Sequence, residues 1–213
     1  MQNYSASQCP RGKLYVVATP IGNLEDMSPR AIRTLESVDV ILAEDTRHSK
    51  QLLNHFGIKK PMHSLHAHNE AEKSLKILEE LKAGKTFALI SDAGTPLISD
   101  PGFVLIREAR HLGFEIIPIP GACAFVSALS VAGVPCDSFL FAGFLPAKQK
   151  SRKERLSTLK NCGVTAVVYE SSHRIIDCLL DIESLFASHY QLVMAKELTK
   201  SFEHVKQSLF GSF

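Results

Sequence analysis

The chain has 213 residues, enough for one large core or two modest ones, because domains commonly hold about 100 to 150 residues each. Apolar residues make up 45% of the chain and charged residues 22%, which excludes a disordered or fibrous protein. The net charge of +2 excludes a nucleic-acid-binding field spread over the whole molecule. Any polyanion must therefore bind at a local basic patch.

Cysteine usage and the N-terminus bear on the compartment. Residues 1–12 form a polar tail without the apolar segment that a secretory signal needs. No apolar run approaches the ~20 residues that span a bilayer, so we expect no membrane association. The cysteines are widely spaced and form no C-x-x-C pair, which predicts reduced thiols in a cytoplasmic protein. They are Cys9, Cys123, Cys136, Cys162 and Cys178.

Residues 13–118 alternate between predicted strands and helices. A helical pattern follows each of the first four strands, which favours a mainly parallel sheet covered on both faces. This alternation predicts an N-terminal α/β domain over 13–118. Apolar and β-branched runs place its strands at 13–19, 38–44, 61–67, 86–90 and 114–119.

Capping signals predict where three helices of this domain begin. Ser28 precedes a proline and is a good N-cap. Asn69, with Glu72 three residues later, predicts a capping box before three leucines at helical spacing. Asp100 before Pro101 predicts a third start, with Asp100 as N-cap and Pro101 as the first helical residue.

A second set of elements follows a proline-containing joint at 118–123. We expect it to form a smaller C-terminal α/β domain over 119–213 with a mixed sheet. Its predicted helices are 124–133, 148–159 and 173–186, and its predicted strands are 138–144, 164–170 and 190–197.

The segment 91–102, SDAGTPLISDPG, directly follows the buried strand predicted at 86–90. Ligands of open α/β sheets bind beyond the carboxyl ends of strands, so this loop is a candidate ligand site. Carboxylates at Asp92 and Asp100 would repel a phosphate, and the sequence contains no G-x-G. The loop therefore favours a cation or a ligand with hydroxyl groups. ATPIGN at 18–23 is predicted to lie at the same sheet edge, on the other side of a cleft.

The segment AEDTRH places Glu44, Asp45 and Arg47 at the end of the second strand. One interpretation is a polar cluster on the substrate that contains a general base. The other is an N-cap with a weak local ion pair. Both interpretations stay open at this stage.

A histidine cluster precedes the third helix. Neutral imidazoles two or three residues apart can converge on a metal ion, as in a metal hydrolase, which makes His63, His66 and His68 with Glu70 candidate ligands. No further Cys, His or carboxylate cluster at a metal-binding spacing accompanies them. We therefore predict no metal site and expect a surface or helix-entry role.

The segment KQKSRKER at 148–155 holds five basic residues and one acid. Such a run forms either a solvated helix face or, beside a cleft, a set of phosphate contacts. Aromatic residues do not interleave it, so base stacking is not indicated. The candidate RNA-binding residues are Lys148, Lys150, Arg152, Lys153 and Arg155.

Several segments, in this order, resemble the ribosomal RNA small subunit methyltransferase I family of the tetrapyrrole methylase fold superfamily. They are ATPIGN, AEDTR, HxHNE, SDAGTPLISDPG, PGAC with SALS, GFLPAK, YESSHR and KELTK, and they span about 13 to 200. The resemblance implies a two-domain α/β fold, a homodimer, and S-adenosylmethionine bound between the domains. It also implies methylation of a cytidine ribose 2′-hydroxyl in the decoding region of 16S rRNA, within the small ribosomal subunit.

The resemblance also implies which residues form the site. The cofactor is a sulfonium cation with ribose hydroxyls and no phosphate, which agrees with the acidic loop. The target hydroxyl must lose a proton, and Glu44, Asp45 and Asp100 are candidate bases that the sequence does not rank. The expected cofactor contacts are Pro20, Asp92, Ala93, Gly94, Thr95, Ile98, Ser127, Ala128, Glu170 and Ala195.

Two alternative functions stay open. One is methylation of a small molecule such as a tetrapyrrole, which would not need the basic run at 148–155. The other is a non-catalytic RNA-binding or assembly module that retains the fold. Family members continue for several tens of residues past KELTK, so the resemblance predicts a shortened C-terminal domain that lacks a strand of its sheet.

Overall fold

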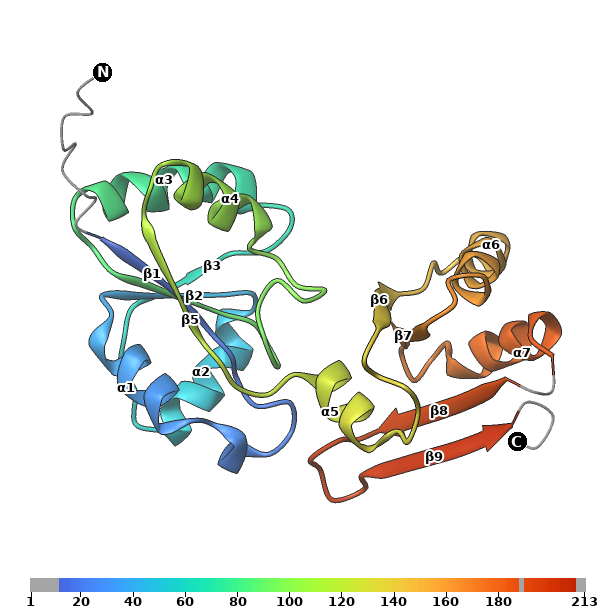
Figure 1. The fold of residues 1–213 in the computed structure, drawn as a ribbon. Helices are drawn as coiled ribbons and strands as arrows, with labels where there is room; N and C mark the ends of the chain where they lie inside the picture. Colours follow the sequence, from blue (N-terminus) through green and yellow to red (C-terminus); the bar gives the residue numbers. More distant parts are fainter. Residues whose placement is uncertain (1–11, 188–189, 210–213) are drawn as a thin grey trace. The chain divides into compact units, whose positions relative to one another are not determined.

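The computed structural model describes residues 12–187 and 190–209 (Figure 1). The chain divides into two compact units, Met1–Cys123 and Ala124–Phe213. The division falls at the end of the proline-containing joint, a few residues after the boundary predicted at 118. Cys9 and nearly all of the expected polar tail lie outside the described residues.

Unit 1 contains a five-stranded sheet with the order β3-β2-β4-β1-β5, in which every pairing is parallel. β2 and β4 are buried along their whole length, as apolar strands covered on both faces must be. The predicted alternation of strands and helices is confirmed. The strands are β1 (Lys13–Val17), β2 (Val40–Ala43), β3 (Met62–Ser64), β4 (Phe87–Ile90) and β5 (Glu115–Ile119).

Helices cover both faces of this sheet (Figure 1). α1 (Pro29–Ser37) and α2 (Thr46–His55) share one buried apolar cluster with the sheet, and a short 3-10 helix, η1 (Leu24–Asp26), precedes α1. α3 (Glu70–Lys82) and α4 (Phe103–His111) share the other. The helices after the neighbouring strands β1 and β4 thus lie on opposite faces, and ligands bind at such a topological switch point.

The first predicted helix start is confirmed, because the hydroxyl of Ser28 accepts a hydrogen bond from the backbone N–H of Ala31 at 3.1 Å. The prediction for α4 was wrong. This helix begins at Phe103, its N-cap is Gly102, and Asp100 does not cap it. The carboxylate of Glu70 instead accepts hydrogen bonds from the backbone N–H groups at the start of α4.

The predicted start of α3 is confirmed, because Asn69 is its N-cap, but the predicted capping box does not form. The Asn69 side chain makes no cap hydrogen bond and instead accepts one from the backbone N–H of His66 at 2.9 Å. Glu72 forms an exposed ion pair with Lys76 at 3.2 Å. Leu75, one of the three leucines at helical spacing, is 67% exposed. The face of α3 that packs on the sheet therefore differs from the face that the spacing of the three leucines predicts.

Unit 2 contains three helices and four strands within the described residues. β6 and β7 pair in parallel, and β8 and β9 pair antiparallel, so these strands pair two by two. Strand β9 was not predicted, because its polar sequence HVKQSL carries little apolar signal. The elements are α5 (Ala124–Val131), β6 (Phe139–Phe144), α6 (Gln149–Lys160), β7 (Thr165–Tyr169), α7 (Ile175–Leu185), β8 (Gln191–Lys196) and β9 (His204–Leu209).

None of the described helices combines the length and the apolar character that a membrane span needs. Three of the described cysteines, Cys136, Cys162 and Cys178, are free thiols.

Candidate functional site

The acidic loop 91–102 leaves the buried strand β4 at the carboxyl edge of the sheet. Its backbone is held in conformations that residues with a Cβ rarely adopt. Leu97 has φ 71° and Ser99 has φ 68°, and such left-handed residues cost about 1–2 kcal/mol each. Strain of this kind accumulates at ligand-binding positions, which agrees with the predicted role of the loop.

Two backbone hydrogen bonds join the acidic loop to the segment 18–23. The N–H of Thr19 donates to the carbonyl of Gly94 at 2.9 Å, and the N–H of Gly94 donates back at 3.1 Å. Thr19 is 1% exposed, and its hydroxyl lies 3.3 Å from the carbonyl oxygen of Ser91. The segments that follow β1 and β4 therefore form one rigid edge. Sequence reasoning missed Thr19, because its partners lie more than 70 positions away.

Gly94 is tightly packed within this edge. A Cβ on this residue would lie 3.2 Å from the Cγ2 atom of Ile21, and its φ of 83° already disfavours a side chain. The neighbouring hydroxyl of Thr95 donates to the carbonyl of Ala122 at 3.1 Å, at the end of unit 1. Within the predicted cofactor-binding stretch, Ala93 is exposed, Gly94 is buried and Thr95 is half-buried.

Three carboxylates gather beside this edge. Burial, followed by the charges of Asp100 and Asp92, raises the pKa of Glu44 above its usual range. Burial also raises the pKa of Asp100; a hydrogen bond with Ser91 opposes this effect, and the charge of Asp92 adds to it. Desolvated carboxylates beside like charges are typical of functional sites, and both Glu44 and Asp100 have the pKa direction expected of a general base.

Asp45 differs from these carboxylates because it caps a helix. Its Oδ1 atom accepts hydrogen bonds from the backbone N–H groups of Arg47 at 2.8 Å and His48 at 3.4 Å. These bonds, led by the one from Arg47, lower the pKa of Asp45. Its own N–H donates to Oδ1 of Asp92 at 3.1 Å. Of the two interpretations of AEDTRH, the N-cap describes Asp45, while Glu44 lies in the carboxylate cluster with a raised pKa.

Glu70 makes a structural contact that the sequence did not predict. Its side chain is buried, and its Oε1 atom accepts from the backbone N–H groups of Gly102 at 3.1 Å, Val104 at 2.7 Å and Leu105 at 3.3 Å. These are the free donors at the start of α4. Glu70 therefore holds the last residues of the acidic loop. Glu70 belongs to the HxHNE segment, which drew attention to it as a candidate metal ligand, but nothing in the sequence indicated that its partner is the start of α4.

The histidines near Glu70 do not form a metal centre. The rings of His66 and His68 meet edge-on at 6.1 Å between centroids, and a ring nitrogen of His66 contacts the Asn69 amide at 2.9 Å. Among residues 12–187 and 190–209, no group of three His, Cys, Asp or Glu side chains could hold a metal ion.

The candidate cofactor residues of unit 2 lie on three elements. Ser127 and Ala128 belong to α5, Glu170 directly follows β7, and Ala195 belongs to β8. The backbone N–H of Phe125 at the start of α5 donates to the hydroxyl of Tyr169 at 3.2 Å. This contact brings α5 and the end of β7 together within unit 2.

Glu170 carries a buried oxygen without a hydrogen-bond partner among the described residues. Its side chain is 4% exposed, and its Oε1 atom pairs with Arg174 at 2.7 Å and accepts from the N–H of Ser171 at 2.7 Å. Its Oε2 atom is buried and has no partner among the described residues. A buried carboxylate oxygen without a donor is costly, and a hydroxyl or amino group of a ligand would satisfy it.

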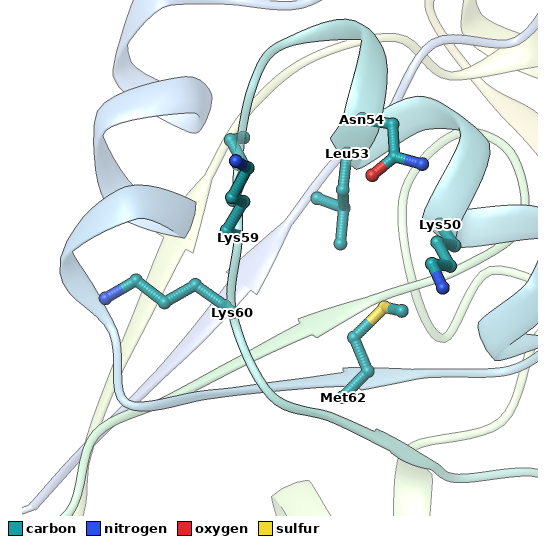
Figure 2. A pocket seen from close by; sticks show the side chains of 7 residues that line it. Lys50, Leu53, Asn54, Lys59, Lys60 and Met62 are labelled. Atoms are coloured by element: carbon teal, nitrogen blue, oxygen red, sulfur yellow. The ribbon is translucent and has the colours of Figure 1, made fainter.

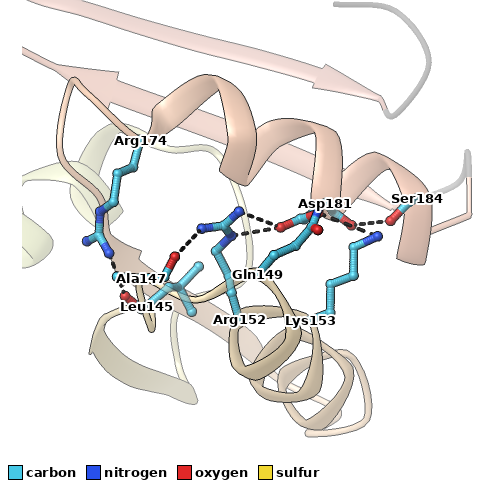
Figure 3. Close-up of polar contacts among 8 residues, drawn as sticks. All are labelled: Leu145, Ala147, Gln149, Arg152, Lys153, Arg174, Asp181 and Ser184. Atoms are coloured by element: carbon cyan, nitrogen blue, oxygen red, sulfur yellow. Dashed lines mark hydrogen bonds and ion pairs between the residues drawn. The ribbon is translucent and has the colours of Figure 1, made fainter.

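The predicted RNA-binding patch needs one correction. Arg152 is 3% exposed, and its guanidinium donates to Asp181 at 2.8 and 2.7 Å and to the carbonyl of Ala147 at 3.2 Å (Figure 3). Arg152 ties α6 to α7 and is not on a solvated face. Burial raises the pKa of Asp181, but hydrogen bonds from Gln149 and Arg152 and nearby positive charges outweigh it and lower the pKa.

The other basic residues of this patch lie nearer the surface. Lys148 and Lys150 are exposed, and Arg155 is half-buried. Lys153 lies 3.5 Å from Asp181, so part of its charge is already compensated (Figure 3). The free charge of the patch is therefore smaller than its sequence indicates.

The family Tetrapyrrole (Corrin/Porphyrin) Methylases matches residues 13–213. Ribosomal RNA small subunit methyltransferase I of Haemophilus influenzae is 53% identical over 194 residues, which are 91% of this chain and 69% of that protein. The protein of the same name from Escherichia coli O157:H7 is 46% identical over 211 residues, 99% of this chain and 74% of that one.

The chain belongs to the ribosomal RNA small subunit methyltransferase I family. The resemblance identified from its motifs is thereby confirmed. Solved structures confirm the tetrapyrrole methylase fold. Uroporphyrin-III-C-methyltransferase from Thermus thermophilus has a TM-score of 0.61 at 21% identity, covering 93% of this chain and 86% of that one. Cobalt precorrin-4 methyltransferase has a TM-score of 0.64 at 13% identity, covering 98% and 89%.

Proposed function

We propose that this member of the ribosomal RNA small subunit methyltransferase I family methylates the ribose 2′-hydroxyl of a cytidine in 16S rRNA, with S-adenosylmethionine as methyl donor. The observation that carries the proposal is the carboxylate cluster beside the strained loop at the switch point of the sheet. It occurs in a chain about half identical to relatives that carry the methyltransferase name.

The residues of the chain fit this cofactor chemically. Carboxylate oxygens and backbone groups suit a cation with ribose hydroxyls, whereas a phosphate would be repelled. The unpartnered Oε2 atom of Glu170 is a further acceptor for a hydroxyl or amine. We propose that Pro20, Asp92, Ala93, Gly94, Thr95 and Ile98 hold the cofactor in unit 1, and Ser127, Ala128, Glu170 and Ala195 in unit 2.

When bound, S-adenosylmethionine supplies an electrophilic methyl group. The contribution of the chain is to position the ribose and to accept the proton that its 2′-hydroxyl loses. We propose Glu44 or Asp100 as the acceptor, because both have a raised pKa. Asp45 is a poor acceptor, since its oxygen is already engaged by two N–H groups.

We further propose that the protein acts as a homodimer in the cytoplasm, where its proposed ribosomal substrate is made. Light scattering on the purified protein tests the first point. A monomer at micromolar concentration would contradict it.

A thermal shift experiment tests the cofactor assignment. S-adenosylmethionine at 100 times its dissociation constant should stabilise the fold by about 2.7 kcal/mol. ATP at the same concentration serves as the control, because it shares the adenosine but carries phosphates that the acidic loop disfavours. An unchanged melting temperature with S-adenosylmethionine, or an equal shift with ATP, would contradict the assignment.

Ribose methylation mapping tests the substrate. Small subunits from cells that lack the protein should gain one 2′-O-methylated cytidine in 16S rRNA when the protein and cofactor are added. Methyl transfer to a tetrapyrrole, with none to small subunits, would favour the small-molecule alternative. Cofactor-independent RNA binding without any transfer would favour the assembly module.

A further inference from the structure

The helix α2 and the strand β3 carry a basic surface that the proposed site leaves unused. Residues 46–69, which span both elements, contain four Lys or Arg and five His but no Asp or Glu. The chain as a whole is nearly balanced, with 24 basic and 22 acidic residues. A long segment without acids on one edge of the sheet therefore concentrates positive charge there.

A hollow of about 250 Å³ opens on this surface between the end of α2 and the edge strand β3. Figure 2 shows Leu53 and Met62 in its middle, with Lys50 on one side and Lys59 and Lys60 on the other. None of its lining residues is acidic. The hollow thus combines an apolar floor with a basic rim.

The lysines of this rim, Lys50, Lys59 and Lys60, are not neutralised by close contact with carboxylates. Among residues 12–187 and 190–209, none of these three lysines forms an ion pair. Lys60 contributes to the lowered pKa of Asp39, but hydrogen bonds from Thr86 are the larger cause. Lysines on the other face of the sheet differ, since Lys82 and Lys85 pair with glutamates at 2.7 and 2.6 Å.

The basic surface is continuous with the carboxylate cluster. Arg47, Lys50 and Asn54 are three and four residues apart on α2, so they lie on one face of the helix. The side chain of Arg47 is 94% exposed, and it lies 3.8 Å from the carboxylate of Asp45, two residues earlier. With 10 residues, α2 spans about 15 Å, so the face leads from the proposed base to the hollow.

We propose that this face of α2 and the rim of the hollow bind the phosphodiester backbone of the RNA substrate. We call it the α2–β3 surface, formed by Arg47, Lys50, Lys59 and Lys60. The inference rests on the proposed function, since it names where that substrate lies beyond the reacting nucleotide. Flexible ammonium groups suit phosphates as point charges, and such contacts set the register of a nucleic acid without reading its sequence.

A triple variant with Lys50→Ala, Lys59→Ala and Lys60→Ala tests the α2–β3 surface. The matched control is Lys76→Ala, Lys82→Ala and Lys85→Ala, which removes the same charge from lysines that are ion-paired on the other face. The measurement is affinity for a small-subunit rRNA fragment across salt concentrations, without cofactor. The rim variant should bind about 10-fold or more weakly at low salt, with a salt slope smaller by about two to three.

The control variant should keep the wild-type slope, and both variants should keep the wild-type melting temperature. Equal affinities of the rim and control variants would overturn the proposal. Wild-type RNA affinity combined with weakened methylation of intact subunits would also overturn it, in favour of a protein contact. Failure of the proposed function would appear separately, as the absence of a cofactor-dependent thermal shift in the wild type.

Discussion

Three carboxylates of the site, Glu44, Asp45 and Asp100, differ in their hydrogen bonds and in their pKa values. Asp45 accepts two backbone hydrogen bonds and has a lowered pKa, whereas burial raises the pKa of Glu44 and Asp100. Asp92 accepts from the N–H of Asp45 and so joins the ends of β2 and β4. At the scale of single residues, the site thus divides carboxylates with a structural task from the carboxylates that we propose for proton transfer.

Glu44→Gln and Asp100→Asn should identify the general base. Loss of the base should slow single-turnover methylation about 10²- to 10⁴-fold, the usual contribution of proton transfer. The other variant should change the rate much less. Glu36→Gln, an exposed glutamate at the end of α1, is the control. Wild-type rates in both variants would contradict the assignment of the base to this cluster.

The pH dependence of the two groups follows from the direction of their shifts. A base acts when deprotonated, so methylation should decline as the pH falls through an apparent pKa above the usual carboxylate range. The pH dependence of folding stability runs in the opposite direction. A raised folded-state pKa means that folding favours the protonated form, so this stabilisation is present below the unfolded pKa and is lost as the pH rises through the folded value. Neither variant should therefore lower stability at neutral pH.

Glu70 links elements that are distant in the chain. It begins α3, yet its Oε1 atom satisfies the backbone at the start of α4, more than 30 residues later. Gly102, which precedes α4, has φ 125°, and a Cβ there would lie 2.7 Å from the Cδ2 atom of Leu89. The acidic loop is therefore fixed at its end by one carboxylate and by one position without a side chain.

Replacing Glu70 by Ala should lower the free energy of unfolding by about 1–3 kcal/mol, because buried N–H groups lose a charged acceptor. Glu72→Ala is the matched control on the same helix, since its exposed i,i+4 ion pair is worth about 0.5 kcal/mol or less. Urea denaturation of both variants measures the difference. Similar small losses would show that Glu70 does not hold the loop.

The two units differ in how their cores are built. Unit 1 has two buried apolar clusters, one on each face of a five-stranded sheet. Unit 2 has a smaller cluster between α6, α7 and its strands, made of Leu145, Leu156, Leu159, Cys178 and Ile182. Local stability follows buried apolar contact, so we expect it to be distributed unevenly over the whole molecule.

Amide hydrogen exchange at neutral pH should show this difference. Amides of β1, β2 and β4 should be protected longest, because they lie inside the sheet of unit 1. Amides of the two-stranded pair β8 and β9 should exchange earlier. Mass spectrometry of peptides from each strand measures the order. Slower exchange in β8 and β9 than in β4 would contradict this account of the two cores.

The sequence by itself determined the alternation of elements, the position of the acidic loop after β4 and the family. Each depends on local pattern or on a contiguous motif. The tertiary structure alone decided that Glu70 rather than Asp100 satisfies α4, that Arg152 is buried against Asp181, and that Glu44 and Asp45 differ. The physical reason is that the pKa and exposure of a charged side chain depend on its partners in space, and for Glu70, Arg152 and Glu44 those partners lie tens of residues away.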